Sequence, residues 1–388
     1  MRDFHFPGRS PVISGNAMVA TSGSLASVVA IDVLKNGGNA VDAAITAAAV
    51  LSITEPHMTG IGGDCFALIS LADGRIIGLN GSGRASANAD KSWLESENLP
   101  EIHPDSVHAL TVPGAVDAWA TLLDTYGTFT LAEALAPAIA LARDGVPTGQ
   151  RTAFDWHLQV SRLSGNSGSR QHFLLNGRAP RMGEVMSFPA LATSLEKIAS
   201  AGPEVFYRGE LADDMVRTLK EHGSLLDHND FAVTKASWCE PLKTGFAGRD
   251  IYELPPNGQG ITTLISLNIL KQFDLERHKP HSAQRWHFEI EAMKQATLLQ
   301  HRHIADPKYM NMTAEELLSD ELARQLAMSI NPDAANNNPE AQHARPGSDT
   351  VYLCVVDHQG MAVSFINSIY QSFGSAITTS ESGICLQN

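Results

Sequence analysis

The stretch that decides the fold is Gly347-Ser348-Asp349-Thr350-Val351-Tyr352-Leu353-Cys354-Val355-Val356-Asp357. The residues before it, 329–349, are rich in Asn, Pro, Ala and Gly, which is typical of an exposed, mobile segment. After it, Val351 to Val356 form an unbroken apolar run, which predicts a strand buried on both faces. A short polar turn and a second apolar run, Met361 to Ile366, then predict a hairpin whose first residue is Thr350.

A threonine at the start of a buried strand can be a nucleophile if a base lies within hydrogen-bond reach. The residue's own α-amino group, with a pKa of about 8, can act as that base. This amine exists only after the Asp349-Thr350 bond is cut, and the Thr350 hydroxyl can make the cut by attacking the Asp349 carbonyl. This chemistry makes Thr350 a candidate nucleophile and Asp349-Thr350 a candidate cleavage site, but a threonine before a strand is common and does not by itself identify either.

The bulk composition excludes several classes of protein. With 388 residues, 43% hydrophobic and 18% charged, the chain is globular and long enough for two lobes. Its formal net charge of −14 argues against nucleic-acid and anionic-membrane partners. The four cysteines form no C-x-x-C pair and H-E-x-x-H is absent, so neither a zinc site nor a disulfide framework is expected. The N-terminus lacks the apolar segment of a secretory signal, so a cytoplasmic location is expected.

The rest of the chain alternates between helical and strand patterns. Helices are expected from Ser24 and from Asn39, and a hairpin over Cys65 to Leu79 follows the turn Thr59-Gly60-Ile61-Gly62-Gly63-Asp64. That turn lacks the spacing of a phosphate-binding loop. The pattern of residues 90–300 predicts mainly helices, although residues 160–180 are polar and predicted to be irregular.

Several ordered motifs, spread over nearly the whole chain, closely resemble the gamma-glutamyltransferase family of N-terminal nucleophile hydrolases. They are Gly37-Gly38-Asn39-Ala40-Val41-Asp42, Thr59-Gly60-Ile61-Gly62-Gly63, Val112-Pro113-Gly114-Ala115, Pro255-Pro256-x-Gly258, Glu291-Ala292-Met293-Lys294, the Asp349-Thr350 junction, Phe373-Gly374-Ser375 and Ser382-Gly383-Ile384-x-Leu386-x-Asn388.

This resemblance implies an α+β fold, the αββα four-layer sandwich. It implies a zymogen that cleaves itself into two parts. Residues 1–349 form the large-subunit region, and residues 350–388 form the start of the small subunit. It also implies acyl transfer from an amide through a threonyl ester, with no metal or organic cofactor. By motif position Thr350 corresponds to the nucleophile, and Ser368 to a second hydroxyl that hydrogen-bonds it. A heterodimer of the cleaved halves, and a homodimer of these, are compatible with the resemblance.

Two departures from the family pattern concern the substrate. The family's carboxylate-binding arginine aligns with Ser82, and Arg84, two residues on, is the candidate that replaces it. Tyr370 stands where glutamyl-specific members carry an asparagine. At both positions the sequence resembles the cytoplasmic branch of the family that includes oxamate amidohydrolase. This resemblance favours a short acid amide as substrate. Arg84, Tyr370 and Asn388 are therefore the predicted substrate-binding residues.

The end of the sequence leaves alternatives open. The chain stops at Asn388, whereas the family's small subunit is much longer and supplies the oxyanion-holding amides, so the remainder is expected to be absent. Three interpretations follow: an oxamate-like amide hydrolase or acyltransferase, a true γ-glutamyltransferase or glutathione hydrolase, and an uncleaved, inactive binding protein. A conventional serine hydrolase is disfavoured because no G-x-S-x-G motif occurs.

Overall fold

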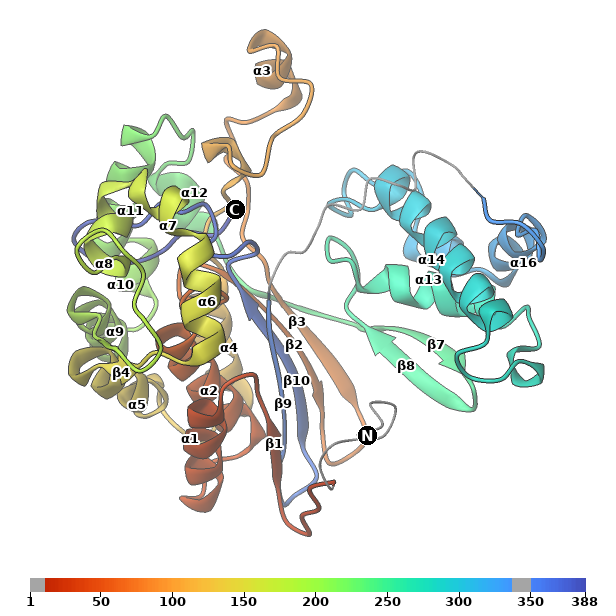
Figure 1. The fold of residues 1–388 in the computed structure, drawn as a ribbon, viewed down its shortest axis with the longest axis horizontal. Helices are drawn as coiled ribbons and strands as arrows, with labels where there is room; N and C mark the ends of the chain where they lie inside the picture. Colours follow the sequence, from red (N-terminus) through yellow and green to blue (C-terminus); the bar gives the residue numbers. More distant parts are fainter. Residues whose placement is uncertain (1–10, 337–349) are drawn as a thin grey trace. The chain divides into compact units, whose positions relative to one another are not determined.

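The computed structural model describes residues 11–336 and 350–388, and these divide into two compact units (Figure 1). The first unit holds residues 11–75, 81–236 and 350–388. The second holds 76–80 and 237–336. The hairpin that begins after Thr350 thus belongs to the same unit as the N-terminal helices. Asp349, and with it the predicted cleavage site and the end of the predicted mobile segment, lies outside the described residues.

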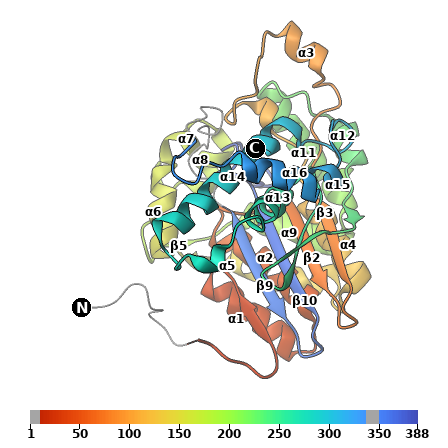
Figure 2. The same cartoon turned by 90° about the vertical axis from the view of Figure 1, so that its right-hand side faces the viewer.

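The central feature of the first unit is an antiparallel sheet in the order β1-β9-β10-β2. The strands are β1 (Met18–Ala20), β2 (Asp64–Ser70), β9 (Val351–Val356) and β10 (Ala362–Ser368). Figure 2 shows β9 and β10 side by side, and their register pairs Asn367 with Val351. The predicted hairpin is confirmed, and it lies between two strands from the N-terminal part of the chain.

Helices cover one face of this sheet. The helix α2 (Ala40–Thr54) packs on β9 and β10, and α4 (Ala115–Tyr126) packs on β2 (Figure 1). Alanines at 43, 44, 47, 48 and 49 are fully buried and let α2 approach its neighbours closely. The start of α2 is fixed by a capping box between Asn39 and Asp42. The remaining helices of this unit are α1 (Ser24–Lys35), α3 (Lys91–Ser96), α5 (Leu131–Asp144), α6 (Gln150–Leu158), α7 (Val160–Ser164), α8 (Ser167–Phe173), α9 (Pro189–Ala201), α10 (Glu204–Tyr207), α11 (Glu210–Glu221) and α12 (His228–Val233).

Two expectations about this unit were wrong. The strand β9 is buried on one face only, because α2 covers Val351, Leu353 and Val355 while Tyr352 on the other face is 52% exposed. Within residues 160–180 only 174–180 are irregular, since α7 and α8 take up most of 160–173. These helices are short and lack an apolar stripe, but Asn166 caps α8 by accepting from the Ser169 amide.

The second unit is built from short strands and a helical layer. Its strands are β3 (Ile76–Gly81), β6 (Ser237–Cys239), β7 (Leu242–Phe246) and β8 (Arg249–Glu253), with β7 and β8 forming a two-stranded antiparallel sheet. Its helices are α13 (Gly260–Leu270), α14 (Ala283–His303), α15 (Ala314–Leu317) and α16 (Asp320–Met328). The core lies between α13 and α14, where Ile265, Ile269 and Ala292 are buried.

Candidate active site

The sheet topology brings three chain segments together at one edge. The strand β9 starts just after Thr350, β10 ends at Ser368, and β2 starts at Asp64. Because neighbouring strands run antiparallel, the start of β9, the end of β10 and the start of β2 share an edge of the sheet. The hydroxyl oxygens of Thr350 and Ser368 are 3.2 Å apart there. The structure therefore brings together the two residues that the sequence named as catalytic.

The side chains of this edge lie on the face away from α2. Side chains alternate along a strand, and Val363, Phe365 and Asn367 of β10 point into the helical layer, where each is at most 1% exposed. Ser368 therefore points to the open face. Ser368 is paired directly with Asp64 across β10 and β2, so these two side chains point to the same side. Thr350, Ser368 and Asp64 form a row across three strands.

Asn367 fixes the inner side of this edge. Its side-chain oxygen accepts from the Trp119 indole N–H at 3.0 Å. Its amide nitrogen donates to the Thr59 hydroxyl at 2.8 Å and to the Gly60 carbonyl at 3.2 Å. The glycine turn is thereby tied to the end of β10. A Cβ on Gly63 would lie 1.9 Å from the Ser368 carbonyl oxygen, so only glycine allows this approach.

A tight loop follows Ser368 and carries Tyr370. The Tyr370 amide donates to the Ser368 hydroxyl at 2.9 Å, and Tyr370 has a left-handed φ of 72° with a side chain that is 45% exposed. Arg162 of α7 holds the loop by donating to the carbonyls of Ser372 and Gly374, both at 2.8 Å. The Ser368 hydroxyl thus contacts both the Thr350 hydroxyl and the Tyr370 amide.

The predicted substrate-binding residues differ in how they are engaged. Asn388 is half-buried, and its side chain binds the Pro104 carbonyl at 2.9 Å and both the amide and the side chain of Gln371 at 3.2 and 3.0 Å. The Arg84 backbone carbonyl accepts from the Val112 amide at 2.9 Å, while its side chain is exposed. A Cβ on Gly83 would lie 1.5 Å from the Val112 carbonyl oxygen, so the segment that carries Arg84 is held tightly.

Asp64 is the functional candidate that the sequence interpretation missed. Its Oδ1 atom is buried and has no hydrogen-bond partner among the described residues. Burial raises the pKa of its carboxyl to about 7, against an ordinary value of 3.8. The signal was present in the sequence: Asp64 directly follows Gly62-Gly63 and opens a strand, a position where a carboxylate is unusual.

Other kinds of functional group in the described residues do not form a comparable site. Burial raises the pKa of the thiols of Cys65, Cys239 and Cys385, which keeps them protonated and unreactive near neutrality. In the described part of the chain, no group of three or more His, Cys, Asp or Glu side chains could hold a metal ion. None of the helices described is both long and apolar enough to cross a membrane.

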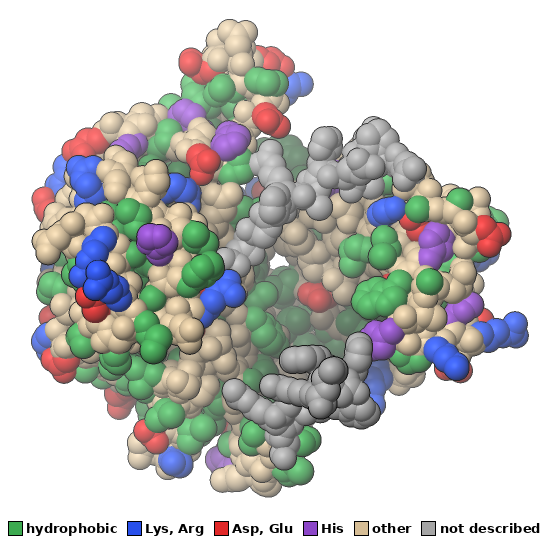
Figure 3. All heavy atoms as spheres, viewed as in Figure 1, with side chains coloured by type: hydrophobic (Ala, Val, Ile, Leu, Met, Phe, Trp, Pro, Cys, Tyr) green, Lys and Arg blue, Asp and Glu red, His purple; other side chains and the backbone are tan. Residues whose placement is uncertain are grey.

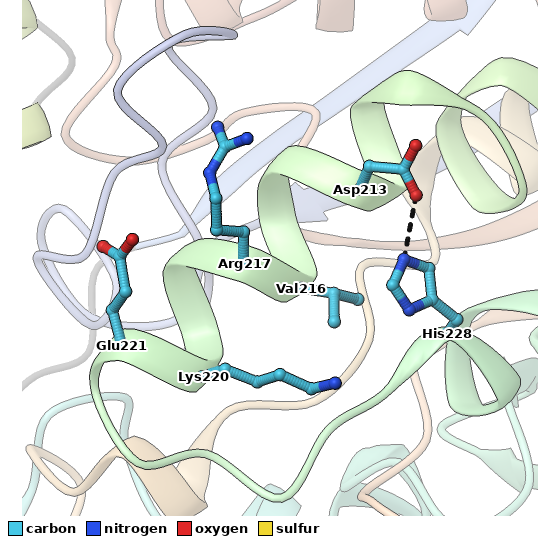
Figure 4. Close-up of a pocket in the computed structure, with 6 residues that line it drawn as sticks. All are labelled: Asp213, Val216, Arg217, Lys220, Glu221 and His228. Atoms are coloured by element: carbon cyan, nitrogen blue, oxygen red, sulfur yellow. Dashed lines mark hydrogen bonds and ion pairs between the residues drawn. The ribbon is translucent and has the colours of Figure 1, made fainter.

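A pocket of about 520 Å³ is lined by residues of α11 and α12 (Figure 4). It is lined by Asp213, Val216, Arg217, Lys220, Glu221 and His228. Figure 4 shows the interaction of His228 with Asp213, whose nitrogen and oxygen atoms are 2.9 Å apart. None of the side chains that line the pocket carries a hydroxyl or a thiol. Since this pocket lacks a hydroxyl or thiol nucleophile, the Thr350 edge is the candidate site.

Comparison with known proteins agrees with this geometry. Residues 26–388 match the gamma-glutamyltranspeptidase family. The chain is 37% identical over 379 residues to a glutathione hydrolase-like proenzyme of Bacillus subtilis, covering 97% of this chain and 71% of the relative. It is 35% identical over 382 residues to the oxamate amidohydrolase proenzyme of Klebsiella pneumoniae, covering 97% and 71%.

Solved structures give the same result for the fold. The crystal structure of cephalosporin acylase from Bacillus halodurans superposes with a TM-score of 0.90 at 38% identity, covering all of this chain and 72% of that one. The Helicobacter pylori gamma-glutamyltranspeptidase gives a TM-score of 0.79 at 27% identity, covering 88% of this chain and 99% of that one. The predicted N-terminal nucleophile hydrolase fold is confirmed. The chain belongs to the gamma-glutamyltranspeptidase family of amide hydrolases and acyltransferases.

Proposed function

We propose that this chain is a self-cleaving amide hydrolase whose nucleophile is Thr350. The observation that carries the proposal is the 3.2 Å contact between the hydroxyls of Thr350 and Ser368 at the edge of the sheet. Thr350 is exposed, so a substrate can reach it, while its strand is anchored by the buried side chains of Val351 and Leu353.

The maturation step follows from ordinary acyl chemistry. The Thr350 oxygen bonds to the Asp349 carbonyl carbon, the carbon–nitrogen bond breaks, and the nitrogen gains a proton to become a free α-amine. Water then hydrolyses the ester, leaving a carboxylate on Asp349. In turnover the same oxygen takes the acyl group of an amide substrate, an amine leaves with a proton, and water or a second amine releases the product. The α-amine, with a pKa of about 8, is the base for this second reaction.

The proposed substrate is a short acid amide of the oxamate type. Two observations support this choice. The exposed Arg84 side chain, on a segment held against Val112, can pair with a substrate carboxylate. Tyr370, whose backbone amide binds the Ser368 hydroxyl, carries a large and partly exposed side chain, where a long acyl group would need space. Asn388 would then act mainly by holding Gln371 in the loop.

A second candidate, γ-glutamyl transfer or glutathione hydrolysis, is favoured by similarity alone. The glutathione hydrolase proenzyme of Escherichia coli is 32% identical over 393 residues of alignment. In either case the acting form is a heterodimer of the cleaved halves, and a homodimer of these remains a prediction. The four free cysteines support the cytoplasm as the proposed location.

The test combines intact mass with a substrate panel. We expect two fragments that meet at Asp349/Thr350, and a Thr350→Ala variant that stays whole. Among oxamate, glutathione and a γ-glutamyl anilide, we expect oxamate to be hydrolysed with the highest kcat/KM. Preferred turnover of the anilide would replace the oxamate assignment by the γ-glutamyl one. A wild-type chain that stays whole and inactive would reject Thr350 as the nucleophile.

A further inference from the structure

The first cut cannot use the base that serves turnover. Before cleavage the nitrogen of Thr350 is part of a peptide bond, which is not basic. The Thr350 hydroxyl nevertheless has to lose its proton when its oxygen bonds to the Asp349 carbonyl carbon. Another group near Thr350 must accept that proton, and in this site Ser368 and Asp64 follow Thr350 in a row across β9, β10 and β2.

Hydrogen-bond counting gives this row a direction. The Ser368 oxygen accepts the Tyr370 amide at 2.9 Å, so it keeps one proton to donate and one more lone pair. If Thr350 donates to that lone pair, the Ser368 proton needs an acceptor of its own. Asp64 lies directly opposite Ser368 in the register, where side chains are typically ~5 Å apart at Cβ. Its buried Oδ1 atom has no hydrogen-bond partner among the described residues, Ser368 included, so its acceptor position is open.

We propose that Asp64 is a positioning residue for maturation: acting through Ser368, its carboxylate accepts the proton that leaves the Thr350 hydroxyl. This inference rests on the proposed role of Thr350. As the Thr350 oxygen–carbon bond forms, the Thr350 proton moves to Ser368 and the Ser368 proton moves to Asp64. When the carbon–nitrogen bond breaks, the proton on Asp64 returns through Ser368 to the leaving nitrogen of Thr350. No proton is gained or lost overall.

The surroundings of Asp64 suit this task. Its carboxyl has a pKa raised to about 7 by burial, so near neutrality it exchanges a proton readily. Two further titratable groups at this part of the sheet are Cys65, next to it on β2, and Tyr207, close to Cys65. Burial raises the pKa of both, so neither carries charge near neutrality. Ser368 faces Asp64 from β10 and carries no charge. The glycine turn that precedes Asp64 in the sequence is also uncharged.

The experiment follows cleavage of the full 388-residue chain by intact mass over time, from pH 5 to pH 9. We expect the wild-type rate to rise with pH through a midpoint near 7, because Asp64 must be ionised to accept the proton. Asp64→Asn keeps the shape but not the base, and we expect cleavage to slow by at least ~10²-fold and to lose that midpoint. Asp64→Glu should restore part of the rate together with the pH dependence.

A matched control is Glu55→Gln. Glu55 also has a pKa raised by burial, but it binds Ser22 at the end of α2 and takes no part in the row. Its rate and pH profile should equal those of the wild type. An Asp64→Asn chain that cleaves at the wild-type rate, or slowly with an unchanged midpoint, overturns the inference. If Asp64→Asn fails to fold, a wild-type rate that is flat from pH 5 to pH 9 overturns it as well.

The outcomes separate this inference from the function on which it rests. Cleavage lost in Thr350→Ala but unaffected in Asp64→Asn keeps Thr350 as the nucleophile and rejects Asp64. Cleavage that depends on both residues supports both statements. A wild-type chain that stays whole at every pH rejects both.

Discussion

Asn367 shows how much of the site depends on single buried side chains. Its amide connects Trp119 of α4, the turn at Thr59 and Gly60, and the strand that ends in Ser368. The side chain is 1% exposed, so water cannot replace these bonds. The end of β10, where Ser368 lies, is therefore positioned by buried contacts of its neighbour Asn367.

We expect Asn367→Leu to lower the free energy of unfolding by about 2–4 kcal/mol, because it leaves the Trp119 N–H and the Thr59 hydroxyl unpaired in the core. Urea denaturation in a Thr350→Ala background, which keeps the chain whole, measures this loss. Ser364→Ala is the control, since Ser364 lies on the open face of the same strand and binds only the Tyr352 hydroxyl at 3.1 Å. A change below 0.5 kcal/mol, on the order expected for a surface site, in both variants would contradict the assignment.

Asp64 gives a stability prediction that is independent of cleavage. Its pKa is about 7 in the folded chain and about 3.8 when unfolded, so between these values the folded state binds more protons. The free energy of unfolding therefore falls as pH rises from 4 to 7. In the Thr350→Ala background, Asp64→Asn should be more stable than its parent by about 1–3 kcal/mol at pH 8 and nearly equal to it at pH 4. Denaturation at the two pH values measures both differences, and a destabilised Asn variant at pH 8 would show that the carboxylate is paired.

At the scale of elements, the loop after β10 is held in an unfavourable backbone shape. Tyr370, Phe373 and Ala376 all have positive φ, at 72°, 58° and 57°. Each such residue costs about 1–3 kcal/mol and persists only where the surroundings hold it. The Arg162 side chain supplies much of that hold through two carbonyl contacts.

Removing this hold should loosen the loop more than the fold. We expect Arg162→Ala to increase hydrogen–deuterium exchange in peptides covering 369–376 by about tenfold, because the loop opens locally, whereas peptides from α2 keep their protection. Arg178→Ala is a suitable control, because Arg178 pairs with the half-buried Glu184 rather than with a residue of the loop. Equal exchange in the two variants would mean that the loop does not depend on Arg162.

The elements that the sequence predicted well are those with strong local patterns. Asn39 followed by Asp42 predicts the start of α2, and the two apolar runs after Thr350 predict β9 and β10. The sequence did not predict the short helices α7 and α8, because tertiary contacts stabilise them. In α8, for example, Gly168 packs so closely on another segment that a Cβ there would lie 2.0 Å from the Thr378 carbonyl oxygen. The sequence marks Asp64 only as an unusual carboxylate at the start of a strand. Its place opposite Ser368 depends on a register between strands that no local pattern encodes.

At the scale of the whole molecule, charge and strand order matter most. On the face drawn in Figure 3, acidic and basic side chains are interspersed over the first unit, in keeping with a small-molecule substrate. In the sheet, β9 and β10 lie between β1 and β2, which come from the other side of the proposed cut. The C-terminal fragment would thus be held by two ladders of hydrogen bonds.

We therefore expect the two fragments to stay together after cleavage. They should co-elute in size-exclusion chromatography at neutral pH and separate only in denaturant. Asp214 adds to this attachment by accepting from both the amide and the hydroxyl of Ser382. The control is the uncleaved Thr350→Ala chain, which should elute at the same volume. Elution of a free C-terminal fragment without denaturant would contradict the strand order.

The row of Thr350, Ser368 and Asp64 also has a consequence for timing. Its members come from β2 near the start of the chain and from β9 and β10 near its end, so they meet only when the sheet is assembled. Contacts between such distant segments form late, because the loop that joins them must first be closed. A chain that has misfolded or is incomplete would lack the row and stay uncut. Cleavage before Thr350 would then occur only in chains whose sheet has already assembled, so that it reports correct folding.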